Sequence, residues 1–209
     1  MHPTLQLILV RHGETEWTEL GLLHGRLDSP LSPTGRQHAE QTADRLRGET
    51  FDALFTSPKG RAMQTALILG EALGMEPIAL DGLSEMDFGW SEGKPLTHFD
   101  PDGTGSWLFR PLVRFAMRLT AERTQHFAAR IREAIAAMQA QYPKGRLLVV
   151  THWGVISMLM ALLLDGDLQR WRDYGPWEAC SISELHAEDG VWHTIRMNDH
   201  VHLQEERSI

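Results

Sequence analysis

Two short apolar runs, each followed two residues later by a histidine and soon after by a glycine, constrain the fold of this chain more than any other feature. The first, LQLILV at residues 5–10, leads into His12 and Gly13, and the second, LLVV at 147–150, leads into His152 and Gly154. Short runs of Leu, Ile and Val bounded by turn residues are typical of strands that are buried on both faces of a sheet. Because α/β sheets carry their chemistry at the carboxyl ends of such strands, we expect a functional site at that edge.

The sequence around these two runs alternates between helical and extended patterns. Ser32 and Pro33 mark a helix start, and the terminal segments 181–186 and 191–197 flank an Asp-Gly turn that predicts a hairpin. Alternation of this kind predicts an α/β fold, a three-layer α/β/α sandwich with a mostly parallel central sheet. We expect one domain over residues 1–209 with a cap-like helical insert at about 94–120. The expected elements between the runs are a helix at about 33–47, a strand at 51–56, a helix at 60–73, a strand at 78–80 and a helix at 120–141.

Composition narrows the classes of partner. The 209 residues carry a formal net charge of −8, which argues against a nucleic-acid partner and against an anionic membrane surface. Cys180 is the single cysteine, which excludes an intrachain disulfide and fits a cytoplasmic location. No apolar run approaches the roughly 20 residues that a membrane span needs. Composition makes no prediction about oligomeric state.

Four polar centres are expected to meet at one edge of the sheet. Arg11 and His12 follow the first strand, Arg61 follows the strand that ends near residue 56, Glu85 follows a short apolar turn, and His152 follows the last parallel strand. Taken alone, the first pair also fits an ordinary strand end with a surface histidine. Two arginines and two histidines around one point form an anion site, and a nearby carboxylic acid can protonate a leaving oxygen. Phosphoryl transfer is the reaction that uses all of these groups.

The motifs that contain these residues resemble those of the histidine phosphatase superfamily, to which phosphoglycerate mutases also belong. The resemblance covers residues 5 to about 203, apart from the insert. The matching motifs, in the family's order, are LVRHGET at 9–15, LDSPLS at 27–32, TSP at 56–58 with Arg61-Ala62 and QTA at 64–66, EMDFGWSEG at 85–93, and THWGVI at 151–156.

The resemblance implies a role for each of the central residues. His12 would attack phosphorus and become a phosphohistidine, while Arg11, Arg61 and His152 hold the phosphoryl oxygens. Glu85 would protonate the leaving oxygen and then activate the water that hydrolyses the intermediate. No cofactor or metal is expected, because two guanidinium groups and a protonated His152 would already neutralise the transferring group. The remaining phosphate-binding residues implied by position are Thr15, Thr18, His24, Gly25 and Trp153.

Departures from the mutase pattern favour a phosphatase. Thr18 stands where the mutases, and many of the phosphatases, carry Asn. Asp87 and Phe88 follow the catalytic glutamate, and the chain has no adjacent pair of arginines. A mutase must retain and re-dock a bisphosphate, so the loss of those contacts favours water as the acceptor. The prediction is therefore a phosphomonoester hydrolase acting on small phosphorylated metabolites. A 2,3-bisphosphoglycerate-dependent mutase is the first alternative, and a non-catalytic module that binds phosphorylated ligands is the second.

The insert bears on substrate choice. It interleaves aromatic residues with arginines at four-residue spacing, which places the arginines on one face of any helix formed there. That face is either a solvated surface or a means of meeting a second acidic group on the substrate. The sequence leaves open small phosphorylated acids, sugar phosphates, nucleotides, ribazole phosphate and protein phosphohistidine, and a bulky cap favours the small compounds. The residues concerned are Trp107, Phe109, Arg110, Arg114, Phe115 and Arg118.

Overall fold

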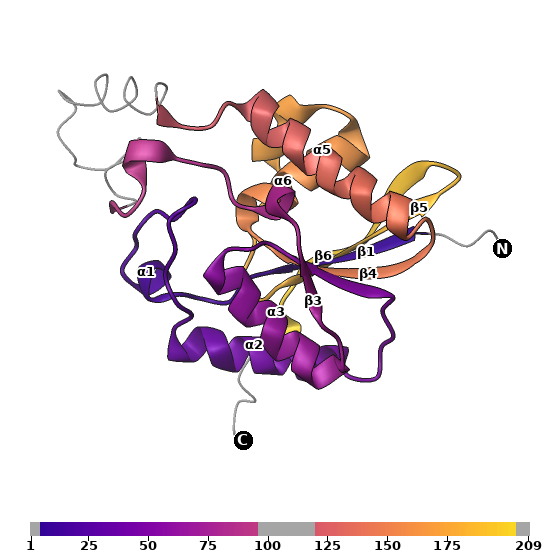
Figure 1. The fold of residues 1–209 in the computed structure, drawn as a ribbon, viewed down its shortest axis with the longest axis horizontal. Coiled ribbons are helices and arrows are strands. Elements are labelled where there is room, and N and C mark those ends of the chain that lie inside the picture. The colour runs from indigo at the N-terminus through magenta and orange to yellow at the C-terminus, as the bar shows by residue number, and fades with distance from the viewer. Residues whose placement is uncertain (1–4, 96–119, 204–209) are drawn as a thin grey trace.

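The computed structural model describes residues 5–95 and 120–203, which fold around a six-stranded sheet (Figure 1). The strand order is β3-β2-β4-β1-β5-β6. Three of the five strand pairings are parallel, and β5 and β6 form the predicted antiparallel hairpin at one side. The strands are β1 (Leu5–Arg11), β2 (Ala53–Thr56), β3 (Pro77–Ala79), β4 (Gly145–Thr151), β5 (Ile182–Glu188) and β6 (Val191–Asp199).

Helices cover both faces of the sheet, which confirms the predicted three layers. Along β1, Ile8 and Val10 pack with α2 and α3, whereas Leu7 and Leu9 pack with α5 and α6. This alternation follows from the two-residue period of a strand and explains why the run is apolar throughout. The longer helices are α2 (Pro33–Leu46), α3 (Gly60–Leu73), α5 (Thr124–Gln141) and α6 (Trp153–Met160). The short elements are α1 (Glu16–Glu19), η1 (Asp81–Leu83), η2 (Gly89–Ser91), η5 (Ala161–Asp165), η6 (Leu168–Asp173) and η7 (Val201–Leu203).

The pairing of β1 with β4 positions the two predicted site histidines. Their register runs in parallel from Leu5 opposite Gly145 to Arg11 opposite Thr151. Both strands therefore end at the same level, and the backbone N–H of His12 donates to the carbonyl of Thr151 over 2.9 Å. The sheet thus places His12 beside His152, as the sequence predicts.

One helix begins later than the sequence predicts, and most of the predicted insert lies outside the described residues. The helix predicted from residue 120 begins at Thr124, because Glu122 is instead tied to Asp87: its backbone N–H donates to the Asp87 carbonyl over 2.7 Å. The insert predicted at 94–120, with the six aromatic and arginine residues named above, lies outside the described residues apart from its ends. Across the described ranges, no helix combines the length and apolar character required to cross a membrane.

Candidate active site

One ring nitrogen of His12 has the free lone pair that a nucleophile needs. The side chain is 4% exposed, and its Nδ1 lies 2.8 Å from the carbonyl oxygen of Gly13. Because a carbonyl oxygen only accepts hydrogen bonds, Nδ1 carries the ring proton and Nε2 keeps its lone pair. The Nε–H of Arg61 donates to that Nε2 over 3.3 Å. Nε2 therefore faces a cation, where it can attack an anionic phosphoryl group.

The site favours neutral histidines. Burial lowers the pKa of His12 well below its usual value, and the charges of Arg61 and Arg11 lower it further. The same causes, burial first, lower the pKa of His24 to about 4. At neutral pH the His12 imidazole is thus unprotonated at Nε2, which a nucleophile requires.

His152 stands behind His12 rather than in the pocket wall. Its side chain is fully buried, its Nε2 lies 2.8 Å from the Ser57 hydroxyl, and its ring meets His12 edge-on with centroids 5.0 Å apart. Burial and the charge of Arg61 lower its pKa well below the usual value. The ring is therefore neutral in the described structure, and the protonated His152 that we expect beside a bound phosphoryl group stays a prediction. A phosphate dianion beside the ring would raise that pKa again, because an opposite charge favours the imidazolium form.

Arg61 is fixed by acceptors that leave little freedom to its guanidinium group. Nη1 donates to the carboxylate of Asp28 and to the carbonyl of Leu27, each over 3.0 Å, and Nη2 donates to the carbonyl of Gly25 over 2.8 Å. Burial lowers the pKa of Arg61, whereas the charges of Glu85 and Asp28 raise it. The guanidinium group of Arg61 is thus held in place next to His12 before any substrate binds.

Glu85 has the environment of a proton donor. Its carboxylate accepts hydrogen bonds from the backbone N–H groups of Met86, over 2.9 Å, and Gly154, over 3.1 Å. Burial raises its pKa despite these bonds and the nearby arginines. A Cβ at position 154 would lie 2.4 Å from Glu85 Oε1, so a larger residue there would displace the carboxyl group from its present position.

Arg130, on α5, clamps the loop that carries Glu85. Its guanidinium donates to three carbonyls of that loop: Gly82 over 3.0 Å, Ser84 over 2.6 Å and Glu85 over 2.9 Å. It also forms two 2.9 Å bonds to Glu122. Although burial raises the pKa of Glu122, the bonds and charge of Arg130 outweigh it and lower that pKa overall. One planar group therefore binds three carbonyl oxygens of the loop that carries Glu85.

Replacing Arg130 by lysine is expected to misplace Glu85 while leaving His12 in position, because an ammonium group cannot reproduce the planar fork. We expect a loss of about 10- to 100-fold in the hydrolysis of alkyl phosphates. Formation of the phosphoenzyme from p-nitrophenyl phosphate should fall much less, since its leaving group needs no proton. Burst kinetics on both substrates provide the measurement. Equal losses on both would assign Arg130 to the fold alone.

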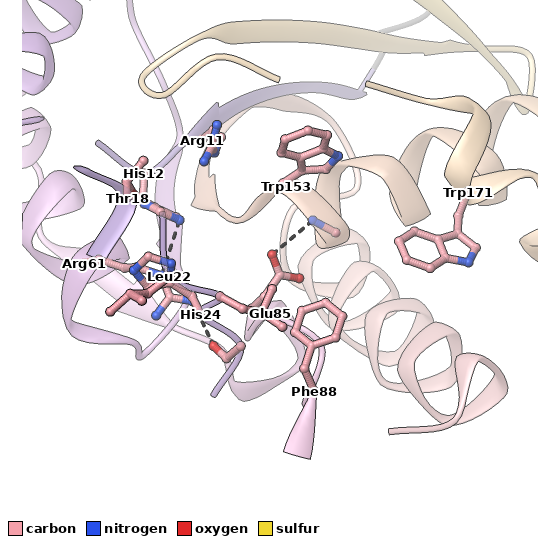
Figure 2. A pocket seen from close by; sticks show the side chains of 13 residues that line it. Arg11, His12, Thr18, Leu22, His24, Arg61, Glu85, Phe88, Trp153 and Trp171 are labelled. Carbon is pink, nitrogen blue, oxygen red and sulfur yellow. Dashed lines mark hydrogen bonds between the residues drawn. The ribbon is translucent and has the colours of Figure 1, made fainter. Parts of the chain in front are cut away.

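His12, Arg61 and Glu85 line a pocket of about 290 Å³ (Figure 2). Most of the predicted phosphate-binding residues line it as well, but Thr15 and His152 do not. Thr15 caps α1 and bonds His24 over 2.7 Å, so it acts by holding that ring. The lining residues are Arg11, His12, Thr18, Leu22, Leu23, His24, Gly25, Arg61, Glu85, Phe88, Trp153, Gly154 and Trp171.

Several contributors were missed by the sequence reasoning. Asp28 and Ser57 lie inside motifs that the sequence analysis named, but it gave neither residue a role. Asp28 accepts a hydrogen bond from Arg61, and Ser57 contacts His152, so both residues position groups of the site. Trp171 and Arg130 come from segments without any motif, and no signal in one sequence marks them.

Within residues 5–95 and 120–203, no group of three or more His, Cys, Asp or Glu side chains is arranged to hold a metal ion.

Comparison with known proteins identifies the class to which this fold and site belong. Residues 7–200 match the model of the histidine phosphatase superfamily, branch 1, and the chain belongs to that family. The match confirms the predicted membership, the α/β fold and the expected class of enzyme.

Individual relatives extend over nearly the whole chain. "Putative phosphoserine phosphatase 2" of Hydrogenobacter thermophilus is 29% identical over 204 residues, which cover 96% of this chain and 98% of that protein. "Adenosylcobalamin/alpha-ribazole phosphatase" of Salmonella typhimurium is 34% identical over 194 residues, covering 91% and 90%. The solved structure of Bacillus stearothermophilus YhfR superposes with a TM-score of 0.82 at 27% identity, covering 96% of this chain and all of the other. Proteins named probable phosphoglycerate mutase are also among the matches.

Proposed function

We propose that this protein is a phosphomonoester hydrolase that works through a phosphohistidine at His12. One observation carries the proposal: the unprotonated Nε2 of His12 faces Arg61 in a pocket that also contains the buried acid Glu85. A neutral nucleophile, a fixed cation and a protonated carboxyl are the three groups that displacement at a phosphate ester needs.

The reaction divides into two halves. In the first, Nε2 of His12 bonds to phosphorus, the bond from phosphorus to the ester oxygen breaks, and Glu85 gives its proton to that oxygen. In the second, the Glu85 carboxylate takes a proton from water, the water oxygen bonds to phosphorus, and the bond to Nε2 breaks. Inorganic phosphate leaves and both residues return to their starting states. Arg11 and Arg61, which line the pocket, are proposed to hold the phosphoryl oxygens throughout. His152 packs on His12 without lining the pocket, and its proposed contact with a phosphoryl oxygen requires its ring to move toward the bound group.

The cations of the pocket favour hydrolysis over mutase activity. Among the described lining residues, the arginines are Arg11 and Arg61, and both stand where a single phosphoryl group would bind. Thr18 lines the same pocket and adds no charge. A bisphosphate held through a full mutase cycle needs cations for its second phosphate, so water is the favoured acceptor.

This choice can be tested on one substrate. When 3-phosphoglycerate is incubated with the protein and 2,3-bisphosphoglycerate, release of inorganic phosphate is expected to exceed conversion to 2-phosphoglycerate. Phosphate is measured colorimetrically and the isomer through coupled enolase. Isomerisation that depends on the bisphosphate and outpaces phosphate release would make the protein a mutase.

From the sequence we also propose the domain organisation, the class of partner, the location and the metal independence of the protein. Residues 1–209 are proposed to form a single domain, with the insert at about 94–120 as a cap over the sheet edge. The net charge of −8 argues for a small phosphorylated partner over nucleic acid, and the single cysteine fits a cytoplasmic location. Metal independence is proposed because two fixed guanidinium groups already face the transferring group.

A further inference from the structure

One side of the pocket is apolar and aromatic. In Figure 2, Phe88, Trp153 and Trp171 lie on the opposite side of the Glu85 carboxyl from His12 and Arg61. Because Glu85 protonates the ester oxygen, the organic part of a substrate begins at that carboxyl and continues away from His12. It therefore extends toward these rings. The residues that form this aromatic wall are Phe88, Trp153 and Trp171.

The two tryptophan rings are held by their surroundings. Trp171 meets the buried Phe127 edge-on, with centroids 6.3 Å apart, and the guanidinium group of Arg172 lies 4.8 Å from its ring. Trp153 opens α6, and its indole packs on the backbone of Gly175, where a Cβ would lie 2.9 Å from the indole Nε1. Rings fixed in this way offer preformed flat surfaces, which bind planar groups at a low cost in entropy.

The charges that line the pocket and the volume of the pocket also favour an organic group with an aromatic ring and no carboxylate. Arg11 and Arg61 are the arginines among the described lining residues, and the first is already engaged by the carbonyl of Trp177 and the ring of Trp153. A carboxylate next to the ester oxygen would lose water without gaining a partner on the aromatic wall. The pocket measures about 290 Å³. Since about 150 Å³ suffices for benzene, this volume has room for one ring beside a phosphate.

We propose that the site selects phosphomonoesters whose organic part carries a planar aromatic ring close to the ester oxygen, and discriminates against esters with a carboxylate there. This inference rests on the hydrolase function proposed above. The aromatic wall supplies the selectivity, and Trp171 is its specificity-determining residue, because it is far from phosphorus and takes no part in the chemistry.

Three esters with primary-alcohol leaving groups separate ring binding from leaving-group chemistry: benzyl phosphate, cyclohexylmethyl phosphate and O-phosphoserine. The protein is expected to hydrolyse benzyl phosphate with a kcat/KM about 2- to 10-fold above that for cyclohexylmethyl phosphate, the range expected for ring stacking. The advantage over O-phosphoserine is expected to exceed about tenfold, because the amino acid brings two charges to an apolar wall.

Matched variants at position 171 test the assignment to Trp171. Trp171→Leu removes the ring and is expected to lower the benzyl-to-cyclohexylmethyl ratio to near one, whereas Trp171→Phe keeps a ring and most of the ratio. Thermal melts verify that both variants fold, and Phe88→Leu provides a second position if Trp171→Leu does not.

Each outcome decides between the two proposals. Phosphate release from none of the three esters, nor from p-nitrophenyl phosphate, would overturn the hydrolase function itself. Release with O-phosphoserine preferred over benzyl phosphate would leave the hydrolase intact and overturn the aromatic selectivity, favouring a role for the insert arginines. An unchanged benzyl-to-cyclohexylmethyl ratio in folded Trp171→Leu and Phe88→Leu would likewise overturn it.

Discussion

Replacing His12 by alanine is expected to remove phosphatase activity almost entirely, with a loss of at least about 10⁴-fold in kcat, as for other enzymes that lose a covalent nucleophile. The expected cause is chemical, since Arg61 keeps its bonds to Asp28, Leu27 and Gly25 and stays in place without the ring. Steady-state phosphate release measures the loss. His193→Ala is the matched control, because that histidine is exposed on β6 and does not line the pocket.

Trapping the intermediate gives the same prediction a second measurement. Rapid quenching with a labelled phosphomonoester is expected to yield one phosphoryl group per chain, labile in acid and stable in base, and peptide mapping should place it on His12. Label on another residue, or more than trace activity in a folded His12→Ala protein, would mean that another nucleophile does the work.

Much of this site follows from where strands end. The runs at 5–10 and 147–150 predict parallel strands, and parallel strands in register bring the residues after them together, so His12 and His152 could be placed beside each other from sequence. Ser32, predicted to start a helix, caps α2 by accepting from the backbone N–H of Gly35 over 3.1 Å. The motifs also identified Arg61 and Glu85 correctly as neighbours in one pocket. Their individual catalytic roles stay predictions.

The features of the candidate site that could not be predicted from the sequence depend on contacts between segments that lie far apart along the chain. Arg130 lies 45 positions from Glu85 along the chain, and nothing in its helical surroundings marks it as a clamp. Trp171 belongs to a short 3₁₀ element, where an aromatic residue has no periodic pattern to reveal its direction. The pKa of His152 depends on contacts of the same kind, because its burial and the charges of the arginines around it, which lower that pKa, follow from the folded structure.

Replacing Glu85 by glutamine is expected to slow the first turnover of an alkyl phosphate by about 10²- to 10⁴-fold, the usual cost of removing a general acid. Glutamine keeps the size of the side chain, but its single amide oxygen can accept from only one of the N–H groups of Met86 and Gly154, and its NH2 group would face the other. The burst with p-nitrophenyl phosphate therefore also serves as the check that the phosphate pocket survives the substitution. The burst with p-nitrophenyl phosphate should be largely spared, because the phenolate leaves without a proton. The burst, not the steady state, must be compared, since water attack on the phosphohistidine also uses Glu85.

The pH dependence adds an independent signature of the same role. Burial raises the pKa of Glu85, so the protonated acid is present below that raised value and is lost as pH climbs through it. The alkyl phosphate burst should therefore decline on the alkaline side, and Glu85→Gln should remove that decline because an amide does not titrate. A decline that persists in Glu85→Gln, or equal burst losses on both substrates, would mean that Glu85 shapes the pocket and that the proton comes from elsewhere. Asp87 is then the next candidate, since it is the carboxylate nearest to Glu85 in sequence and its backbone is tied to Glu122 in the same network as Arg130.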